Sequence, residues 1–331
     1  MWICNAIGIR GYMCAALAMA GVLLFPASGF AQPDQDKRPL KIVVGFSPGN
    51  GADIIARLLA DKMTTALGVP VIVENKPGAG SRIAVDLLKS APADGKTIMI
   101  ATFSAMGMYP MISSKSSYQL TDFAPIAYVA DNHIAMTGSI DAPFTNLKEF
   151  SAWLKLNPDK SQFGTESIGA PGHILGIEFA RRVGVPMTSV AYKTTAQMIT
   201  DQIGGHITAA TWALPSVQKL HQSKQLRVLG IAAAERSPNA PDIPTFREMG
   251  YDIVMTGIYG FYAPAKTPLP ILDQLSKAIV DATGDPVVQQ TMRQIGLEPT
   301  GKPRADFLRV IAEHEKSWAQ IIKNTGFRLN D

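Results

Sequence analysis

Cysteine is almost absent from this sequence. Cys4 and Cys14 are the two cysteines of a 331-residue chain, and both precede residue 15. The rest of the chain therefore contains no residue that could form a disulfide, a thiolate nucleophile or a cysteine-based metal site. Cys14 also lacks the setting typical of lipid attachment, since Gly11-Tyr12-Met13 precede it.

An excess of charge of one sign is missing as well. The chain has 31 Lys and Arg residues against 27 Asp and Glu residues. This weak positive balance gives no basis for binding to nucleic acid or to a membrane surface, so we expect no nucleic-acid partner.

Metal-binding and catalytic patterns are also missing. None of the five histidines stands in a paired spacing such as His-Glu-x-x-His, and no two carboxylates are spaced in a way that suggests acid–base work. We interpret the histidines as structural or solvated, and only His173 lies beside a loop of interest. We therefore expect no metal, no cofactor and no catalytic constellation.

The N-terminus carries an export signal. Arg10 precedes the 12-residue apolar run Cys14–Phe25, and small residues follow at Gly29 and Ala31. As a helix this run would span only about 18 Å, against the roughly 30 Å of a bilayer core, so a signal peptide explains it better than an anchor. Cleavage near Ala31 would remove residues 1–31 and leave 300 residues, enough for two domains.

Strand-like and helix-like runs alternate beyond residue 39. The strand Leu40–Val44 is followed by a Gly-rich turn and then by the helix Ala52–Ala66, in which apolar residues recur at helical spacing. The order repeats with a strand at Val69–Val73, a helix at Arg82–Ser90 and a strand at Thr97–Ala101. Such alternation predicts a mostly parallel sheet covered on both faces.

The middle of the chain keeps this α/β style, and the tail becomes helical. Further helices are expected at Leu147–Leu156, Gly172–Val183, Ala196–Gln202, Pro270–Thr283, Pro286–Ile295 and Arg304–Asn324. Further strands are expected around Phe163, Val190, Ile207 and Arg227–Ala232. The chain is thus predicted to be α/β with a helical C-terminus.

A Gly-x-Ser-x-Gly pattern, Gly45-Phe46-Ser47-Pro48-Gly49, raises the alternative of a secreted α/β hydrolase that uses Ser47. In such enzymes the residue after the serine donates its backbone N–H to the oxyanion. Here that residue is Pro48, which has no N–H, and the pattern follows the first strand rather than a later one. The sequence therefore favours a binding loop over a nucleophile.

Four loops rich in Gly, Ser, Thr and Asn follow predicted strands. Such loops open onto helix N-termini, where backbone N–H groups and the helix dipole favour an anion such as a carboxylate. The four loops are Ser47–Gly51, Asn75–Ser81, Thr102–Ser104 and Thr165–Gly172.

These loops belong to a series of motifs that resembles one receptor family. The segments Ile42–Arg57, Val71–Gly80, Ala91–Thr97, Leu226–Ala232 and Gly260–Pro264, in this order, resemble the Bug or TctC family of periplasmic solute receptors. These receptors serve tripartite tricarboxylate transporters. The resemblance covers about Pro39 to Phe327, nearly all of the chain after the signal.

The resemblance implies a class II periplasmic-binding-protein fold with two α/β lobes, a ligand in the cleft between them and no catalysis. We expect lobe 1 at residues 39–131 and 256–331 and lobe 2 at residues 132–255. It also implies a periplasmic location, delivery to integral-membrane transporter subunits and a small carboxylate ligand. We further expect a monomer.

The resemblance also implies which residues bind the ligand. The family's first loop reads Pro-Gly-Gly-x-x-Asp, and Pro48, Gly49 and Asp53 match it, with Asn50 in place of the second glycine. Its second loop reads Gly-Ser-x-Gly-x-Gly-Ser, which Gly164, Thr165 and Gly169 match in part. In all, the expected ligand-binding residues are Ser47, Pro48, Gly49, Asn50, Gly51, Asp53, Asn75, Thr102, Ser104, Thr165, Glu166, Ser167, Gly169, His173, Tyr192 and Trp212.

Departures from the family pattern suggest the character of the ligand. Met106, Met108, Tyr109 and Trp212 stand where small or polar residues are common. If these side chains face the cleft, they predict a carboxylate with an apolar or aromatic body. The alternatives are that they only fill the core, or that Glu166, at a position that is usually small, favours a ligand that carries an amine.

Overall fold

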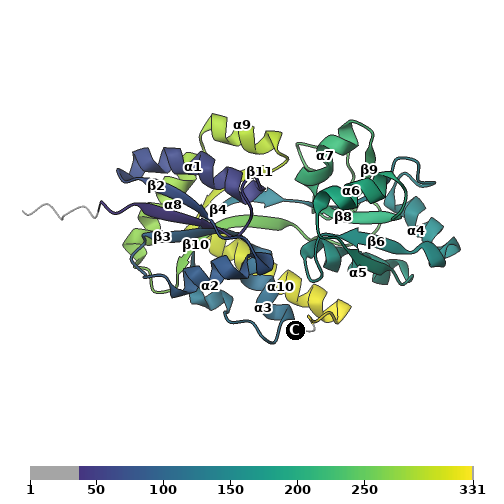
Figure 1. The fold of residues 1–331 in the computed structure, drawn as a ribbon, viewed down its shortest axis with the longest axis horizontal. Coiled ribbons are helices and arrows are strands. Elements are labelled where there is room, and N and C mark those ends of the chain that lie inside the picture. Colours follow the sequence, from purple (N-terminus) through teal and green to yellow (C-terminus); the bar gives the residue numbers. More distant parts are fainter. Residues whose placement is uncertain (1–36, 330–331) are drawn as a thin grey trace, which may run out of the picture. The chain divides into compact units, whose positions relative to one another are not determined.

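The computed structural model describes residues 37–329, and the expected signal peptide lies outside these residues. Within residues 38–329 the chain forms two separate β-sheets, each with its own helices (Figure 1). We call the six-stranded sheet with its helices lobe 1 and the five-stranded sheet with its helices lobe 2. The two-lobed α/β fold is as predicted.

Lobe 1 has the strand order β11-β4-β10-β3-β1-β2. Its strands are β1 (Leu40–Val44), β2 (Val71–Asn75), β3 (Thr97–Thr102), β4 (Phe123–Asn132), β10 (Gly257–Pro264) and β11 (Glu298–Pro303). Its helices are α1 (Gly51–Leu67), α2 (Arg82–Ser90), α3 (Tyr109–Ile112), α8 (Leu269–Thr283), α9 (Pro286–Gln294) and α10 (Arg304–Thr325), with a π-helical turn, Ser104–Met108, before α3.

Lobe 2 has the strand order β7-β6-β8-β5-β9. Its strands are β5 (Ile134–Ser139), β6 (Gln162–Thr165), β7 (Thr188–Ala191), β8 (Ala209–Ala213) and β9 (Leu226–Ile231). Its helices are α4 (Leu147–Leu156), α5 (Pro171–Val183), α6 (Thr195–Ile203) and α7 (Leu214–Gln222). In the part of the chain described, no helix is long and apolar enough to cross a membrane.

Apolar side chains on both faces of each sheet hold the helices in place. On one face of lobe 1, α1, α8 and α9 bury side chains such as Leu59, Ile279 and Met292 against the sheet. On the other face, α2 and α10 pack through Leu88 and Phe307 (Figure 1). This second core is continuous with that of α4 and α5 in lobe 2, while α6 and α7 cover the remaining face.

Strand direction differs from the expected mostly parallel sheet. The predicted strands β1, β2 and β3 are parallel, as are β6, β7 and β8. However, β10 pairs antiparallel with both β3 and β4, and β5 pairs antiparallel with β8 and β9. The reason is that the chain passes from lobe 1 to lobe 2 and returns, so the returning strand runs against the outgoing one.

The two crossings between the sheets lie side by side. The outgoing chain passes from β4 through His133 into β5, and the returning chain enters β10 with Gly257 opposite Asn132. A Cβ on Gly257 would lie 2.9 Å from the carbonyl oxygen of Asn132, so only glycine fits at this close approach without displacement. These crossings position the walls of the site described below.

The predicted helices are all present, with bounds that differ by one residue at most. The strand expected around Ile207 begins two residues later, as β8 at Ala209, and Ile207 itself lies in the bend before it. Its side chain is buried against Gly164 and belongs to the core of lobe 2, although its backbone does not pair with a neighbouring strand. The strands β4, β5, β10 and β11 were not predicted from periodicity, since most of them are buried on both faces and do not alternate.

Candidate ligand-binding site

A cavity of about 620 Å³ is lined by segments of both lobes. Lobe 1 contributes the loop after β1, the start of α2, the end of β3 with the turn that follows, and Tyr259 of β10. Lobe 2 contributes the loop between β6 and α5 and the junction of β8 with α7. Asn132 and Gly257 at the two crossings and Leu329 of the C-terminal tail complete the wall.

Half of the expected binding residues line this cavity, and the other half lie outside its lining. Those in the lining are Asn50, Thr102, Ser104, Thr165, Glu166, Ser167, Gly169 and Trp212. Those outside the lining are Ser47, Pro48, Gly49, Gly51, Asp53, Asn75, His173 and Tyr192.

Asp53 lies under the first loop and holds it together. Its carboxylate accepts the backbone N–H of Gly49 at 2.9 Å, the Arg57 Nε at 3.0 Å and the Asn75 Nδ2 at 2.9 Å. Asn75 also donates to the Phe46 carbonyl at 3.0 Å. Burial acts to raise the pKa of Asp53, but the hydrogen bonds from Arg57, Gly49 and Asn75 outweigh it and hold that pKa below its ordinary value.

Two backbone N–H groups at the first loop are therefore already hydrogen-bonded to nearby side chains. The Gly49 N–H is taken by Asp53, and the Ala52 N–H is capped by the Asn50 Oδ1 at 3.1 Å. Asn50 is thus the N-cap of α1, the position that Asn favours in any helix. In this structure these N–H groups, expected from the sequence to grip a carboxylate, are satisfied within the protein.

His173 and Tyr192 support the second loop from behind. The His173 Nδ1 accepts the Gly169 N–H at 3.2 Å, its Nε2 lies 3.1 Å from the Ser189 hydroxyl, and burial lowers its pKa. Tyr192 donates to Asp201 at 2.9 Å, and burial together with this bond raises its pKa to about 12. Both residues therefore position the wall rather than face the cavity.

Two helices of lobe 2 begin at the cavity. Ala170, Pro171 and Gly172 at the start of α5 are in the lining, as is Ala213 immediately before α7. A Cβ on Gly172 would lie 2.8 Å from the Thr211 hydroxyl oxygen, so glycine lets α5 approach β8 closely. Neither helix has a side-chain cap, and their N-terminal ends present a partial positive charge to the cavity.

Arg82 is a lining residue that sequence reasoning missed. It is the first residue of α2, directly after the predicted loop Asn75–Ser81, and that position was the available signal. Its guanidinium carbon lies 4.7 Å from the centroid of the Tyr109 ring, a cation–π arrangement. Among residues 37–329 it makes no ion pair, so it brings a free positive charge to the wall.

Apolar side chains form much of the remaining cavity wall. Phe46, Met108, Tyr109, Ile134 and Leu329 line the cavity. Trp212 does so too, although it is only 1 % exposed and its indole Nε1 donates to the Thr137 hydroxyl at 2.7 Å. Met106 does not line the cavity and is fully buried in the core, so the expectation for the methionines holds for Met108 and not for Met106.

Ser47 has no surroundings that would make it a nucleophile. It is exposed outside the cavity lining, and Pro48 follows it without an N–H. No hydrogen bond joins its side chain to a histidine anywhere in the described part of the chain. Within the same residues, no group of three or more His, Cys, Asp or Glu side chains could hold a metal ion.

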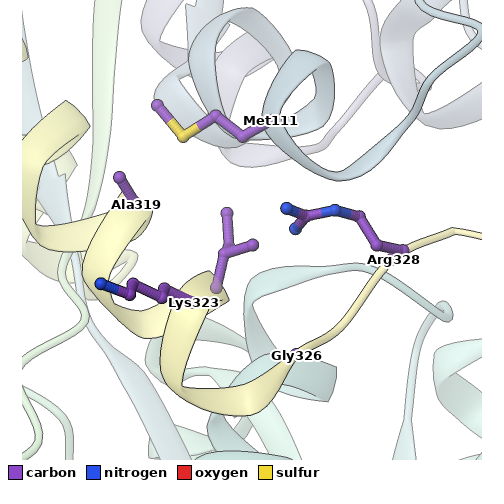
Figure 2. A pocket seen from close by; sticks show the side chains of 6 residues that line it. Met111, Ala319, Lys323, Gly326 and Arg328 are labelled. Carbon is purple, nitrogen blue, oxygen red and sulfur yellow. The ribbon is translucent and has the colours of Figure 1, made fainter.

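A second, smaller cavity of about 370 Å³ lies between α3, α10 and the tail. Its wall includes Met111, Ala319, Lys323 and Arg328. Figure 2 shows Arg328 reaching from the tail into the space below Met111, while Lys323 lies on the far side of α10. Few polar groups converge here, so the larger cavity is the better candidate for a ligand site.

The sequence of this chain is similar to one family of receptors and to individual proteins from several bacteria. Residues 55–327 match the model of the tripartite tricarboxylate transporter family receptor. The chain is 28% identical to Protein BugT of Bordetella pertussis, over 96% of this chain and 99% of that protein. It is 30% identical to a UPF0065 protein of Cupriavidus necator, over 96% of each chain.

Solved structures show the same architecture. A periplasmic transporter structure is 31% identical with a TM-score of 0.78, covering 91% of this chain and 100% of the other. The R. palustris protein Rpa4515, solved with adipate, is 26% identical with a TM-score of 0.79, covering 89% of this chain and 99% of the other.

Proposed function

Because the chain belongs to the tripartite tricarboxylate transporter family of receptors, we propose that it binds a small organic carboxylate in the 620 Å³ cavity and delivers it to membrane subunits. Export by the N-terminal signal, with cleavage near Ala31, would place it in the periplasm. We propose that it acts as a monomer and performs no catalysis.

The cavity itself carries this proposal. Its wall combines the free guanidinium of Arg82 with the N-terminal ends of α5 and α7, three features that favour an anion. The hydroxyls of Thr102, Ser104 and Thr165 add hydrogen-bonding groups. All of these features favour a ligand with an acidic group, and adipate, with which Rpa4515 was solved, has such groups.

The remaining wall indicates the body of the ligand. Phe46 and Tyr109 offer aromatic surface, with the buried Met108 and Trp212 beside them in the wall, which suits a hydrocarbon chain or a ring rather than a polyhydroxylated one. We therefore propose a carboxylate with an apolar or aromatic body.

A thermal-shift screen against small carboxylates tests the proposal. A ligand at 100 times its Kd stabilises the folded protein by about 2.7 kcal/mol, which raises Tm by several degrees in a protein of this size. The variant Arg82→Gln should lose most of this shift, while the matched control Arg293→Gln, on the exposed surface of α9, should keep it. A panel in which no carboxylate shifts Tm would contradict the proposal.

Ligand capture by closure of the lobes follows from the position of the cavity. We propose that the lobes correspond to residues 39–131 with 256–331 and to residues 132–255, and that they rotate about the crossings at Asn132 and Gly257. Both residues line the cavity, so a bound ligand would contact the hinge directly.

A further inference from the structure

Two opposite charges face the same cavity without neutralising each other. Arg82 comes from α2 of lobe 1, and Glu166 comes from the loop between β6 and α5 of lobe 2. Within residues 37–329 neither side chain takes part in an ion pair. A partly enclosed charge is costly unless a partner compensates it, so both side chains would gain from a ligand group of opposite charge.

The protein groups around Glu166 do little to stabilise its negative charge. Its side chain accepts a hydrogen bond from the Thr195 hydroxyl, which lies a long 3.5 Å from the Glu166 Oε1. The side chain is accessible from the cavity, yet protein surrounds it closely enough that desolvation raises its pKa. Its charge also acts on the buried hydroxyl of Tyr259, another lining residue, so both lie at the same part of the wall.

Arg82 is partnered by a ring rather than by an acid. The Tyr109 face below it accepts the cation but leaves its N–H donors free for a ligand. Arg82 and Glu166 stand on different lobes, one at the start of α2 and the other in the loop between β6 and α5, and no ion pair joins them. A ligand would therefore have to reach two different positions to satisfy both.

We propose that the ligand is amphoteric, with an acidic group bound at Arg82 and a cationic amine bound at Glu166, joined by an apolar body that lies against Phe46 and Tyr109. This inference rests on the proposed function and narrows the class of carboxylate. Glu166 is then the residue that determines specificity, because a second carboxylate placed beside it would meet a like charge across the cavity wall.

Calorimetric titration with matched ligands tests this inference. One set is 5-aminopentanoate, pentanoate and glutarate, and the other is 4-(aminomethyl)benzoate, 4-methylbenzoate and terephthalate. Within each set the body is nearly constant and only the far group changes from amine to methyl to carboxylate. At pH 7 we expect the amphoteric member of at least one set to bind at least tenfold more tightly than the other two, a difference of about 1.4 kcal/mol.

The variant Glu166→Gln separates specificity from binding itself. It should remove the preference for the amine and bring the three affinities of the set within about threefold of one another, while the acid-only ligand keeps its affinity. Glu315→Gln, a matched change on the exposed surface of α10, should leave the order unchanged. The preference should also weaken as the pH falls through the raised pKa of Glu166, since the carboxylate then becomes neutral.

The outcomes distinguish this inference from the proposed function. If no member of either set binds, and no carboxylate does so in the wider screen, the proposed function fails. If acids bind but the diacids equal or exceed the amphoteric ligands, or if Glu166→Gln leaves the preference intact, the inference is overturned and the carboxylate receptor stands.

Discussion

Asp53 lies beneath the first loop and organises it through hydrogen bonds to Gly49, Arg57 and Asn75. The residue is 3 % exposed, so protein groups rather than water satisfy its carboxylate. The residue that matches the family motif is therefore a structural support of the binding loop, and its own carboxylate does not face the cavity.

We expect Asp53→Ala to lower the free energy of unfolding by about 2–3 kcal/mol, because it leaves several donors unsatisfied around a buried site. Urea denaturation would show this as a lower midpoint with an unchanged slope. Asp61→Ala, an exposed position on the same helix, is the control and should change stability by less than about 0.5 kcal/mol. Equal effects of the two substitutions would show that the Asp53 bonds contribute little.

The contribution of Asp53 should depend on pH in a defined direction. Its pKa is lower in the folded state, so the stabilisation is present above the unfolded value of about 3.9 and is lost as the pH falls through the folded pKa. The stability gap between the wild type and Asp53→Ala should therefore be full at pH 7 and shrink below pH about 4. A gap that stays constant down to pH 2 would argue against a charged Asp53.

At the scale of elements, the C-terminal tail connects the end of α10 to both lobes. The Leu329 N–H donates to the Ile112 carbonyl of α3 at 2.9 Å, and the Leu329 side chain lines the cavity and lies close to Gly169. The Phe327 ring lies edge-on to His173 of α5 with centroids 5.0 Å apart. The tail is thus a strap between lobe 1 and the second binding loop.

Substitution of this strap should weaken binding as well as stability. We expect Phe327→Ala to destabilise the protein by about 1–3 kcal/mol, because the substitution removes the half-buried ring that packs against His173. Because His173 supports Gly169, ligand affinity should fall by several-fold in calorimetry. Arg328→Ala, at the exposed position between the two contact residues, should change neither affinity nor Tm appreciably, and a loss of affinity there would contradict the assignment.

At the scale of the whole molecule, the paired crossings are the points about which the lobes would move. Small-angle scattering should show a smaller radius of gyration at saturating ligand than without it. An unchanged profile, under conditions in which calorimetry shows saturation, would rule out closure as the response to the ligand.

Gly257→Ala tests the same crossings by mutation. The new methyl group would press on the Asn132 carbonyl and separate the two strands, at a cost of about 1–3 kcal/mol in stability and with weaker ligand binding. Gly284→Ala, at the end of α8 where a Cβ meets only contacts of 3.4 Å and longer, is the matched control. Unchanged affinity in Gly257→Ala would show that the spacing of the crossings does not matter for capture.

Most of the local structure follows from the order of residues along the chain. Helices such as α4 and α2 were predicted to the residue because their amphipathic spacing is a local property of the chain. The motif series also identified the family, and the lack of cysteine beyond Cys14 excluded thiol chemistry. The loops that contribute to the cavity were recognisable because Gly, Ser, Thr and Asn follow each strand.

Which of these loop residues line the cavity depends instead on how distant segments pack together. Asn50 and Asp53 are three positions apart, yet one lines the cavity and the other is buried beneath it. Arg82 and Glu166 were brought to one wall by the crossing strands β4 and β10, which run between lobes and whose buried residues show no alternation. Arg82 and Glu166 are 84 residues apart in the chain. Neither the spacing of residues nor the composition predicts that two such distant charges line the same cavity.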